Sequence, residues 1–351
     1  MDNGNKRMKA LVKYQSGVGN VEIRDVQEPR CGESQVKIEV ACCGICGTDL
    51  HVYHDRFRNY PPVILGHEFA GTIVEAGGAV RDFRPGDRVT VLGAATVTCG
   101  RCAYCRKGEF MFCPQRRGMG HGVDGAFARY VVAREDQLFR LPDNLTTDQG
   151  ALVEPFAAAV HAVCDSTQIR LGDVALISGP GPIGLMCLQL LVAQGIETIV
   201  AGAKADQLRL ETAQKLGAAV VVNVAEQDLL SVVKERTGGF GVDVALECAG
   251  AAASAANCLA AVRPLGRYTQ AGHFGNDVTV PLDQIAFRQL GLAGSVGYTA
   301  DSWHRALRIL AQGRVAIGDL ITHKLPLCQW QEGFARCENK EGLKVLLYPQ
   351  Q

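Results

Sequence analysis

Apolar and polar residues alternate along much of the first part of the chain, which is the pattern of half-buried β-strands. The clearest stretches are residues 9–14, 36–40, 71–76 and 87–91. Pro85-Gly86-Asp87 precedes the last of these stretches and is a turn signal. The pattern predicts a barrel-like β domain from Met8 to about Arg140.

A different pattern begins near residue 174. Short apolar runs at 174–178, 198–201, 220–223 and 242–247 alternate with helical patterns at 183–194, 207–216 and 229–236. Further strands are expected at 267–270 and 292–296. Alternating strands and helices predict a doubly wound parallel sheet with right-handed crossovers. Outside this region, residues 147–170 and 303–311 have helical patterns and residues 342–347 predict a closing strand.

A glycine-rich loop follows the first strand of this second pattern. Gly179-Pro180-Gly181-Pro182-Ile183-Gly184 has the spacing G-x-G-x-x-G and opens the first helix. Such glycines let the backbone approach a pyrophosphate, which also faces the positive end of the helix. The sequence therefore predicts a dinucleotide site with Gly179, Gly181, Pro182 and Ile183 at the phosphates.

The end of the second strand bears on the choice of dinucleotide. NAD-binding folds usually carry an acidic residue there, and Gly202 occupies that position. Ala203 and Lys204 follow, and Lys204 can pair with a 2′-phosphate; Arg209 is a weaker second candidate. We therefore expect NADP(H) to be preferred over NAD(H). In the alternative, Lys204 is a solvated lysine and Asp206 meets the ribose of NAD.

Four cysteines lie at close spacing within the predicted β domain. Cys99, Cys102, Cys105 and Cys113 form C-x2-C-x2-C-x7-C. Four thiolates around a zinc ion leave no open position, so this zinc would be structural. The lobe at residues 96–116 has too little apolar content to fold without metal. Disulfides or a redox pair are the alternative.

A second set of ligand types surrounds Gly44-Ile45-Cys46-Gly47-Thr48-Asp49-Leu50-His51. Together with Gly66-His67-Glu68 and Glu154-Pro155, it supplies a thiolate, an imidazole and two carboxylates. Zinc accepts these ligands in sites left open for chemistry. Thr48 and His51 are candidates to pass a proton to solvent, although His51 alone could be a surface imidazole. An acid at a helix start, such as Glu154, is also commonly a cap.

The order GICGTDLH, GHEFAG, four-cysteine lobe and GPGPIG resembles the zinc-containing medium-chain dehydrogenase/reductases over about residues 8–349. Glu154-Pro155 in place of a cysteine resembles the sorbitol (polyol) and threonine dehydrogenase branches. The resemblance implies an α/β protein with a GroES-like β-barrel catalytic domain at 1–155 and 297–351 and a Rossmann domain at 156–296.

The resemblance also implies roles for individual residues. Cys46, His67 and Glu154 would bind a catalytic zinc, with Glu68 a fourth ligand or a neighbour of the ligands, and the lobe would hold a second zinc. Thr48 would contact the substrate oxygen and relay its proton through the nicotinamide ribose to His51. Further cofactor positions are Gly272, Ser295, Val296 and Lys344, the last facing the pyrophosphate. The segment that follows the Cys46 loop supplies candidates to face the substrate, namely Tyr53, His54, Phe57 and Arg58, and His121 and Phe156 are similar candidates.

Composition narrows the class of partner. The chain has 36 Lys+Arg and 36 Asp+Glu, which argues against nucleic acid or an anionic membrane as the main partner. With no apolar signal segment at the N-terminus, the 14 cysteines favour metal ligands or free thiols in the cytoplasm over disulfides. Residues 174–196 lack charge, but Gly-Pro-Gly-Pro within them favours a strand, turn and helix over a membrane span.

The function expected from the residues and the resemblance is zinc-dependent hydride transfer between a small secondary alcohol or polyol and NADP(H). The resemblance also implies a homodimer or homotetramer. A threonine-type dehydrogenase and an NAD-dependent polyol dehydrogenase are the alternatives within this class. A non-catalytic dinucleotide-binding protein is the alternative from another class.

Overall fold

The computed structural model describes residues 6–350, and the chain divides into two compact units. One unit comprises Met1–Glu154 and Ile317–Gln351, and the other comprises Pro155–Ala316. Residues 1–5 and residue 351 lie outside the described residues. Each unit has its own cluster of buried apolar side chains.

The first unit is built mainly from strands, as the alternating pattern predicts. They are β1 (Arg7–Lys13), β2 (Val21–Gln27), β3 (Gln35–Gly44), β4 (Val63–Ile64), β5 (Glu68–Ala76), β6 (Arg88–Val91), β7 (Tyr130–Arg134), β8 (Leu138–Arg140), β15 (Ile321–Pro326) and β16 (Lys344–Tyr348). A three-stranded sheet has the order β2-β1-β4, and a seven-stranded sheet has the order β15-β16-β3-β5-β6-β8 with β7 paired to β3.

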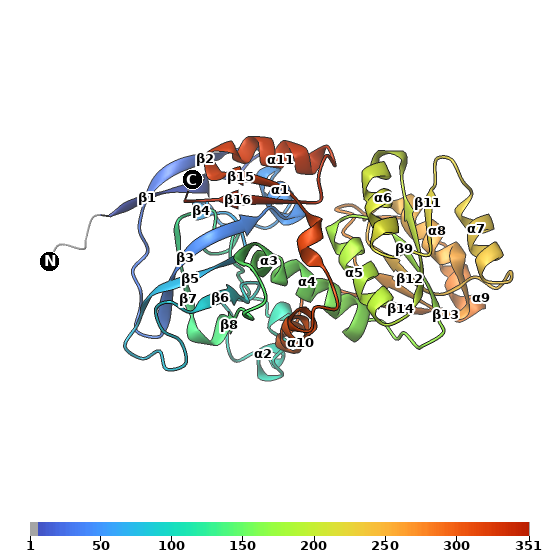
Figure 1. The fold of residues 1–351 in the computed structure, drawn as a ribbon, viewed down its shortest axis with the longest axis horizontal. Helices are drawn as coiled ribbons and strands as arrows, with labels where there is room; N and C mark the ends of the chain where they lie inside the picture. Colours follow the sequence, from blue (N-terminus) through green and yellow to red (C-terminus); the bar gives the residue numbers. More distant parts are fainter. Residues whose placement is uncertain (1–5, 351) are drawn as a thin grey trace. The chain divides into compact units, whose positions relative to one another are not determined.

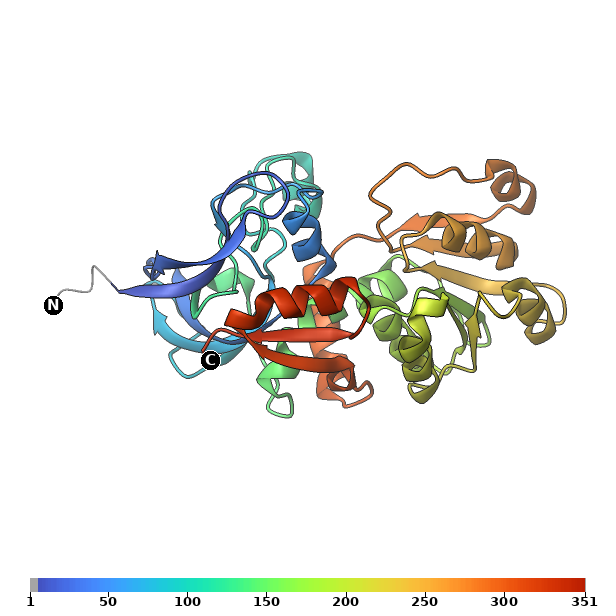
Figure 2. The ribbon, with the colours of Figure 1, turned by 90° about the horizontal axis from the view of Figure 1, so that it is seen from above.

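Short helices complete the first unit. They are α1 (Gly47–Tyr53), α2 (Ala103–Arg106), α3 (Thr147–Ala151) and α11 (Trp330–Glu338), with 3-10 turns η1 (Phe110–Phe112), η2 (Glu135–Gln137), η5 (Ile317–Leu320) and η6 (Leu327–Gln329). Figure 2 shows α11 lying along β15 and β16, and its Trp330 and Phe334 are buried in the core of this unit. Because β16 pairs with β3, the end of the chain lies beside Gly44.

The second unit contains the predicted parallel sheet. Its strands are β9 (Val174–Ser178), β10 (Glu197–Gly202), β11 (Val220–Asn223), β12 (Val242–Glu247), β13 (Val262–Gln270) and β14 (Gly291–Gly294), in the order β11-β10-β9-β12-β13-β14. The strand order reverses between β9 and β12, and ligands of such sheets bind at the carboxyl ends of the strands near this point.

Helices flank both faces of this sheet. They are α5 (Pro182–Ala193), α6 (Gln207–Lys215), α7 (Leu229–Arg236), α8 (Ala252–Ala261) and α9 (Leu282–Arg288), with the 3-10 turn η4 (Lys204–Asp206). A further helix, α10 (Ala300–Ala311), follows β14. In Figure 1, α5 and α6 lie on one side of the sheet and α7, α8 and α9 on the other. The charge-free residues 174–196 form β9, the glycine loop and α5. No helix in the described part of the chain is long and apolar enough to cross a membrane.

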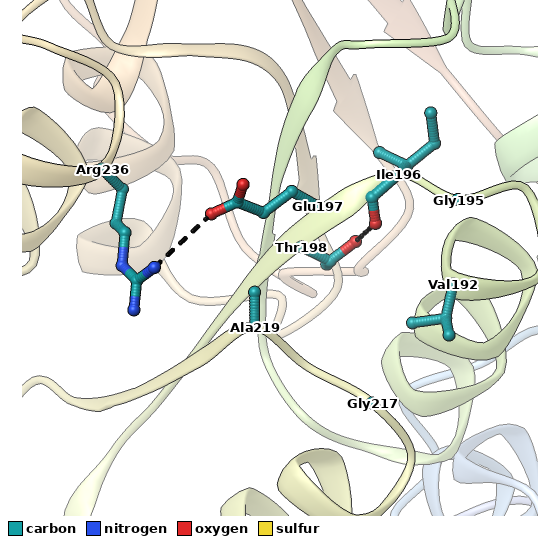
Figure 3. A pocket seen from close by; sticks show the side chains of 8 residues that line it. All are labelled: Val192, Gly195, Ile196, Glu197, Thr198, Gly217, Ala219 and Arg236. Carbon is teal, nitrogen blue, oxygen red and sulfur yellow. Dashed lines mark hydrogen bonds and ion pairs between the residues drawn. The ribbon is translucent and has the colours of Figure 1, made fainter.

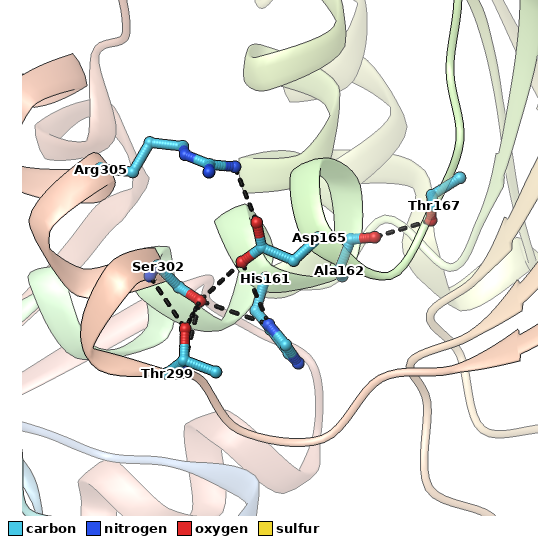
Figure 4. A network of polar contacts seen from close by, with 7 residues as sticks. All are labelled: His161, Ala162, Asp165, Thr167, Thr299, Ser302 and Arg305. Carbon is cyan, nitrogen blue, oxygen red and sulfur yellow. Dashed lines mark hydrogen bonds and ion pairs between the residues drawn. The ribbon is translucent and has the colours of Figure 1, made fainter. Parts of the chain in front are cut away.

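The boundary between the units differs from the expected return at residue 297, because the second unit continues to Ala316. The expected helix over 147–170 is divided into α3, α4 (Val153–Val160) and a π-helical turn, η3 (His161–Asp165). Ser302, at the start of α10, donates to Asp165 Oδ2 (2.7 Å), and Arg305 pairs with Asp165 Oδ1 (2.7 Å) (Figure 4). These contacts attach α10 to η3 within the second unit.

Candidate metal centre and dinucleotide loop

Cys46, His67 and Glu68 each offer a possible ligand atom, and these three atoms lie within 4.8 Å of one another. Cys46 is the N-cap of α1, directly after β3. Glu68 begins β5, and its register partner in β3 is Gly44. The antiparallel pairing of β3 with β5 therefore brings the two parts of the sequence together at one end of the sheet.

Asp49 orients both parts of this group. The carboxylate is buried; Oδ2 accepts the Cys46 N–H (2.9 Å), and Oδ1 accepts the Gly66 N–H (3.3 Å) and lies 3.6 Å from His67 Nδ1. The sequence reasoning assigned no role to Asp49. The sequence feature that could have identified Asp49 is an acid at the third helical position, where a side chain commonly accepts a hydrogen bond from the N-cap N–H.

The donor set fits a divalent cation such as zinc. Burial lowers the pKa of His67, but the Asp49 carboxylate and the Cys46 thiolate outweigh burial and raise it well above its usual value. Within the described residues His67 Nδ1 is a buried atom without a hydrogen-bond partner. A thiolate, an imidazole and a carboxylate around one point are the donors of open zinc sites.

Lys344 lies elsewhere than the sequence reasoning expected. Its side chain is 3% exposed and forms an ion pair with Glu68, which is 1% exposed. Its ammonium also donates to Ile45 O (3.1 Å). The ammonium is thus directed at the carboxylate beside the candidate metal centre, and not at a pyrophosphate, because the β16–β3 pairing carries Lys344 into the first unit's interior.

The remaining expected catalytic residues occupy separate positions. Thr48 is half-buried and His51 is exposed, one turn apart on α1. Residues at this spacing share a helix face, which is compatible with a proton route from the centre to solvent. Glu154 is half-buried at the start of α4 and is not among the three residues that converge.

The candidates to face a substrate fall into two groups. Phe57 and His121 lie edge to face, with ring centroids 5.1 Å apart, and burial together with His67 and Arg116 lowers the pKa of His121 to about 4. Arg58 lies over the ring of Tyr60.

The others are engaged in packing. Tyr53 packs against Trp330 and Phe334, His54 pairs with Glu338, and Phe156 is fully buried.

The four cysteines of the lobe converge as their spacing predicts. The sulfurs of Cys99, Cys102, Cys105 and Cys113 lie within 4.8 Å of one another, and all are free thiols. Backbone N–H groups point at three of the sulfurs, including Cys105 N–H at Cys102 Sγ (3.4 Å). The N–H groups of Arg101 and Cys102 lower the pKa of Cys99 to about 6. Four converging sulfurs fit a closed, structural zinc site.

The glycine loop connects β9 to α5 at the carboxyl edge of the parallel sheet. Gly179 has a φ of 104°, and a Cβ there would lie 2.5 Å from Ala249 N, so only glycine fits. Pro182 begins α5 and Ile183 follows it. The nearest atom to a Cβ built on Gly181 is Arg209 Nη1, 4.0 Å away. The outer side of Gly181 therefore offers space, with a guanidinium at its border.

Basic and acidic side chains both lie near the end of β10, where the choice between NADP and NAD is expected to be made. Ala203 and Lys204 are exposed after the buried Gly202. Asp206 is buried, accepts the Ala203 N–H (3.1 Å) and lies 3.6 Å from Arg209. A Cβ on Gly202 would lie 2.9 Å from Pro180 Cγ, so close packing is a second reason for glycine at this position.

The other expected cofactor positions lie at the same edge. Gly272 follows β13, and Ser295 and Val296 follow β14, where the Ser295 N–H bonds to Gln270 O (2.9 Å). Glu247, at the end of β12, is fully buried and holds these turns. Its carboxylate accepts the Ala249 and Gly250 N–H groups and Gln270 Nε2. The sequence reasoning missed Glu247, whose signal was an acid closing an apolar strand.

A separate cavity of about 450 Å³ lies at the opposite edge of this sheet (Figure 3). Its lining includes Glu197 and Thr198 at the start of β10, Gly217 and Ala219 before β11, and Arg236. Because these are the amino ends of the strands, this cavity is not the expected dinucleotide site.

Comparisons with known proteins bear on both units. The family model of the alcohol dehydrogenase GroES-like domain matches residues 32–143, and that of the zinc-binding dehydrogenases matches residues 182–312. They confirm the expected GroES-like and Rossmann-type domains.

Full-length relatives cover nearly the whole chain. A sorbitol dehydrogenase of Halalkalibacterium halodurans is 38% identical over 97% of this chain and 99% of its own length. A D-arabitol-phosphate dehydrogenase of Enterococcus avium is 38% identical over 97% of each chain. An L-threonine 3-dehydrogenase of Anaeromyxobacter sp. is 34% identical over 97% of this chain and 99% of its own.

A solved structure is also similar to this chain over nearly its whole length. The crystal structure of a Sinorhizobium meliloti 1021 protein bound to NADP is 34% identical, has a TM-score of 0.90, and covers 98% of this chain and 100% of its own. The matched domains and the relatives agree with the motifs from which the resemblance was drawn. The chain belongs to the zinc-containing medium-chain dehydrogenase/reductases, a family of oxidoreductases.

Proposed function

We propose that this protein is a zinc-dependent dehydrogenase that interconverts a secondary alcohol or polyol with its ketone and prefers NADP(H). The convergence of Cys46, His67 and Glu68 carries the proposal, because a protein that only binds a dinucleotide has no need of it. A zinc ion held there would act as a Lewis acid on the substrate oxygen, and a bound nicotinamide would exchange the hydride.

Residues around this site would position the metal ligands and transfer the proton of the substrate. Asp49 fixes the start of α1 and the strand entry before His67, so Cys46 and His67 keep their separation. The Thr48 hydroxyl would accept the proton of the substrate hydroxyl, and His51 would release it to solvent. Glu154 remains a predicted further ligand. The lobe cysteines would hold a second zinc that has no catalytic position.

The preference for NADP(H) rests on charge at the end of β10. Lys204 is exposed there, Arg209 borders Gly181, and no acidic side chain stands at residue 202. The NADP-bound relative from Sinorhizobium meliloti supports this assignment. Asp206 is the competing feature, but its carboxylate already lies near Arg209 and the Ala203 N–H.

A threonine-type dehydrogenase is the second candidate, and the relative from Anaeromyxobacter sp. supports it. We measure kcat/KM for polyols, simple secondary alcohols and L-threonine, each with NADP and NAD, and repeat the best pair after zinc chelation. Chelator-sensitive oxidation of polyols with NADP supports the proposal. Activity only with threonine would refute the polyol assignment, and a clear preference for NAD would refute the preference for NADP(H). Turnover unaffected by full zinc removal would refute the zinc dependence. Light scattering tests the expected dimer or tetramer.

A further inference from the structure

Two arginines converge on one tyrosine near the candidate metal centre. The guanidinium carbons of Arg58 and Arg117 lie 5.0 and 4.2 Å from the ring centroid of Tyr60. Both arginines are exposed, and no ion pair with a carboxylate involves either of them among residues 6–350. A ring face attracts a guanidinium and limits its motion, so both charges are held in place.

This arginine pair is adjacent to the centre through the chain segments that carry it. The Tyr60 N–H donates to His121 O (2.9 Å), and the His121 ring packs against Phe57. Gly120 lies so close to Gly66, the residue before His67, that a Cβ there would be 2.9 Å from Gly66 O. The segments that carry the arginine pair therefore adjoin the segment that carries His67.

Two further arginines lie in the segments that carry the arginine pair, and few carboxylates there balance this positive charge. Arg56 and Arg116 belong to the same two segments. The acids of these segments have other partners. Asp55 accepts the Gly17 N–H (2.8 Å) and Asn59 Nδ2 (3.0 Å), and Asp124 accepts the Ile64 N–H (2.9 Å). Neighbouring like charges repel, so a bound anion would relieve the repulsion between the guanidiniums.

We propose that Arg58 and Arg117 bind the phosphate group of a phosphorylated polyol whose reacting hydroxyl lies at the Cys46–His67 centre. This inference rests on the proposed dehydrogenase activity and names its substrate class. Guanidinium groups present paired N–H donors that match two oxygens of a phosphate monoester. A sugar alcohol with a terminal phosphate has hydroxyls at one end for the centre and two negative charges at the other for the arginines.

Kinetics on matched substrates tests this assignment. We compare kcat/KM for sorbitol with that for sorbitol 6-phosphate, and for D-arabitol with that for its 5-phosphate, with the zinc-loaded protein. The wild type is expected to favour the phosphate esters. Arg58→Gln and Arg117→Gln are each expected to reduce the ester-to-polyol ratio by about 10- to 100-fold, the range for a hydrogen bond to a charged group. Arg117→Lys keeps the charge but loses the paired donors, so an intermediate ratio is expected.

Arg24→Gln is the matched control. Arg24 is another exposed arginine that lies over a tyrosine ring, 4.1 Å from the Tyr14 centroid, but on β2. Its substitution removes the same charge and a similar stacking contact, together with an ion pair to Glu22 (2.7 Å), and should leave the ratio unchanged. Zinc content and circular dichroism of each variant show that it has folded.

Calorimetric binding of sorbitol 6-phosphate and of inorganic phosphate distinguishes a failure of the proposed dehydrogenase function from a failure of the proposed phosphate site. If no polyol or ester is oxidised, the proposed function fails, and weaker ester binding by Arg58→Gln and Arg117→Gln still supports the phosphate site. If polyols are oxidised but the ester is neither preferred nor bound more weakly by these variants, the inference is wrong and the dehydrogenase assignment stands. Inorganic phosphate binding as tightly as the ester would assign the arginine pair to a free anion instead and overturn the substrate class.

Discussion

Replacing Lys344 by methionine is expected to destabilise the first unit by about 3–5 kcal/mol, the usual cost of removing one partner from a buried ion pair. The reason is that the Glu68 carboxylate, at 1% exposure, would lose the ammonium paired with it, and Ile45 O would lose its donor. Methionine has a similar stem, so lost packing should contribute little.

The second substitution of a thermodynamic cycle tests the electrostatic origin of this loss. Glu68→Gln in the Lys344→Met background removes the uncompensated charge, so the double variant should be more stable than Lys344→Met alone. The coupling energy between residues in contact is typically about 0.5–3 kcal/mol. An uncoupled result would mean that the two side chains do not form the pair described above.

Urea unfolding provides the measurement, and the chain supplies a separate reporter for each unit. Trp330 lies in the first unit and Trp303 in the second, and these are the protein's 2 tryptophans. Fluorescence in a Trp303→Phe background therefore follows the first unit alone. The concentration of free zinc is the same for every variant, because a bound zinc stabilises the folded state by mass action.

A contact between Lys344 and the cofactor would produce a different result. If Lys344 contacts the cofactor pyrophosphate, Lys344→Met should raise the KM for NADP and change the free energy of unfolding by less than about 1 kcal/mol. A loss of about 3–5 kcal/mol without a dinucleotide identifies the buried pair as the cause.

Three shorter predictions address the other sites. Cys102→Ser should leave about one zinc per chain instead of two, because only the lobe site is broken; unchanged zinc by atomic absorption would contradict the assignment. His51→Gln should slow alcohol oxidation by about 10-fold at low pH and less at high pH, where solvent accepts the proton readily; a pH–rate profile parallel to wild type removes His51 from the relay. Lys204→Gln should lower kcat/KM by about 10-fold with NADP and leave NAD unaffected, and equal losses with both dinucleotides would show that Lys204 does not contact the 2′-phosphate.

Features set by local spacing could be predicted from the sequence. The C-x2-C-x2-C-x7-C run brings its sulfurs together through two short turns, and the glycine loop needs only the strand before it and the helix after it. In both cases the residues that cooperate are close in the chain. The structure therefore places the four sulfurs together, and the glycine loop at the carboxyl edge, as expected.

Features set by pairing between distant strands could not be predicted this way. Lys344 meets Glu68 only because β16 pairs with β3 and β3 pairs with β5, and no local pattern specifies these registers. The sequence reasoning consequently took a buried lysine for a cofactor ligand. The boundary near residue 297 differed for a similar reason, since Ser302 and Arg305 contact Asp165 from far along the chain.

The two acids beside Cys46 and His67 are compensated in different ways, and the difference bears on the proposed chemistry. Asp49 is satisfied by backbone N–H groups and holds the site's geometry. Glu68 is balanced by Lys344, which leaves Cys46, among the three residues that converge, as the one whose negative charge is not already matched. A divalent ion bound by this set would therefore retain positive charge, and retained charge allows a Lewis acid to polarise a substrate oxygen. On this argument Lys344 would support the proposed chemistry from inside the first unit, by limiting how much negative charge Glu68 would deliver to a bound metal.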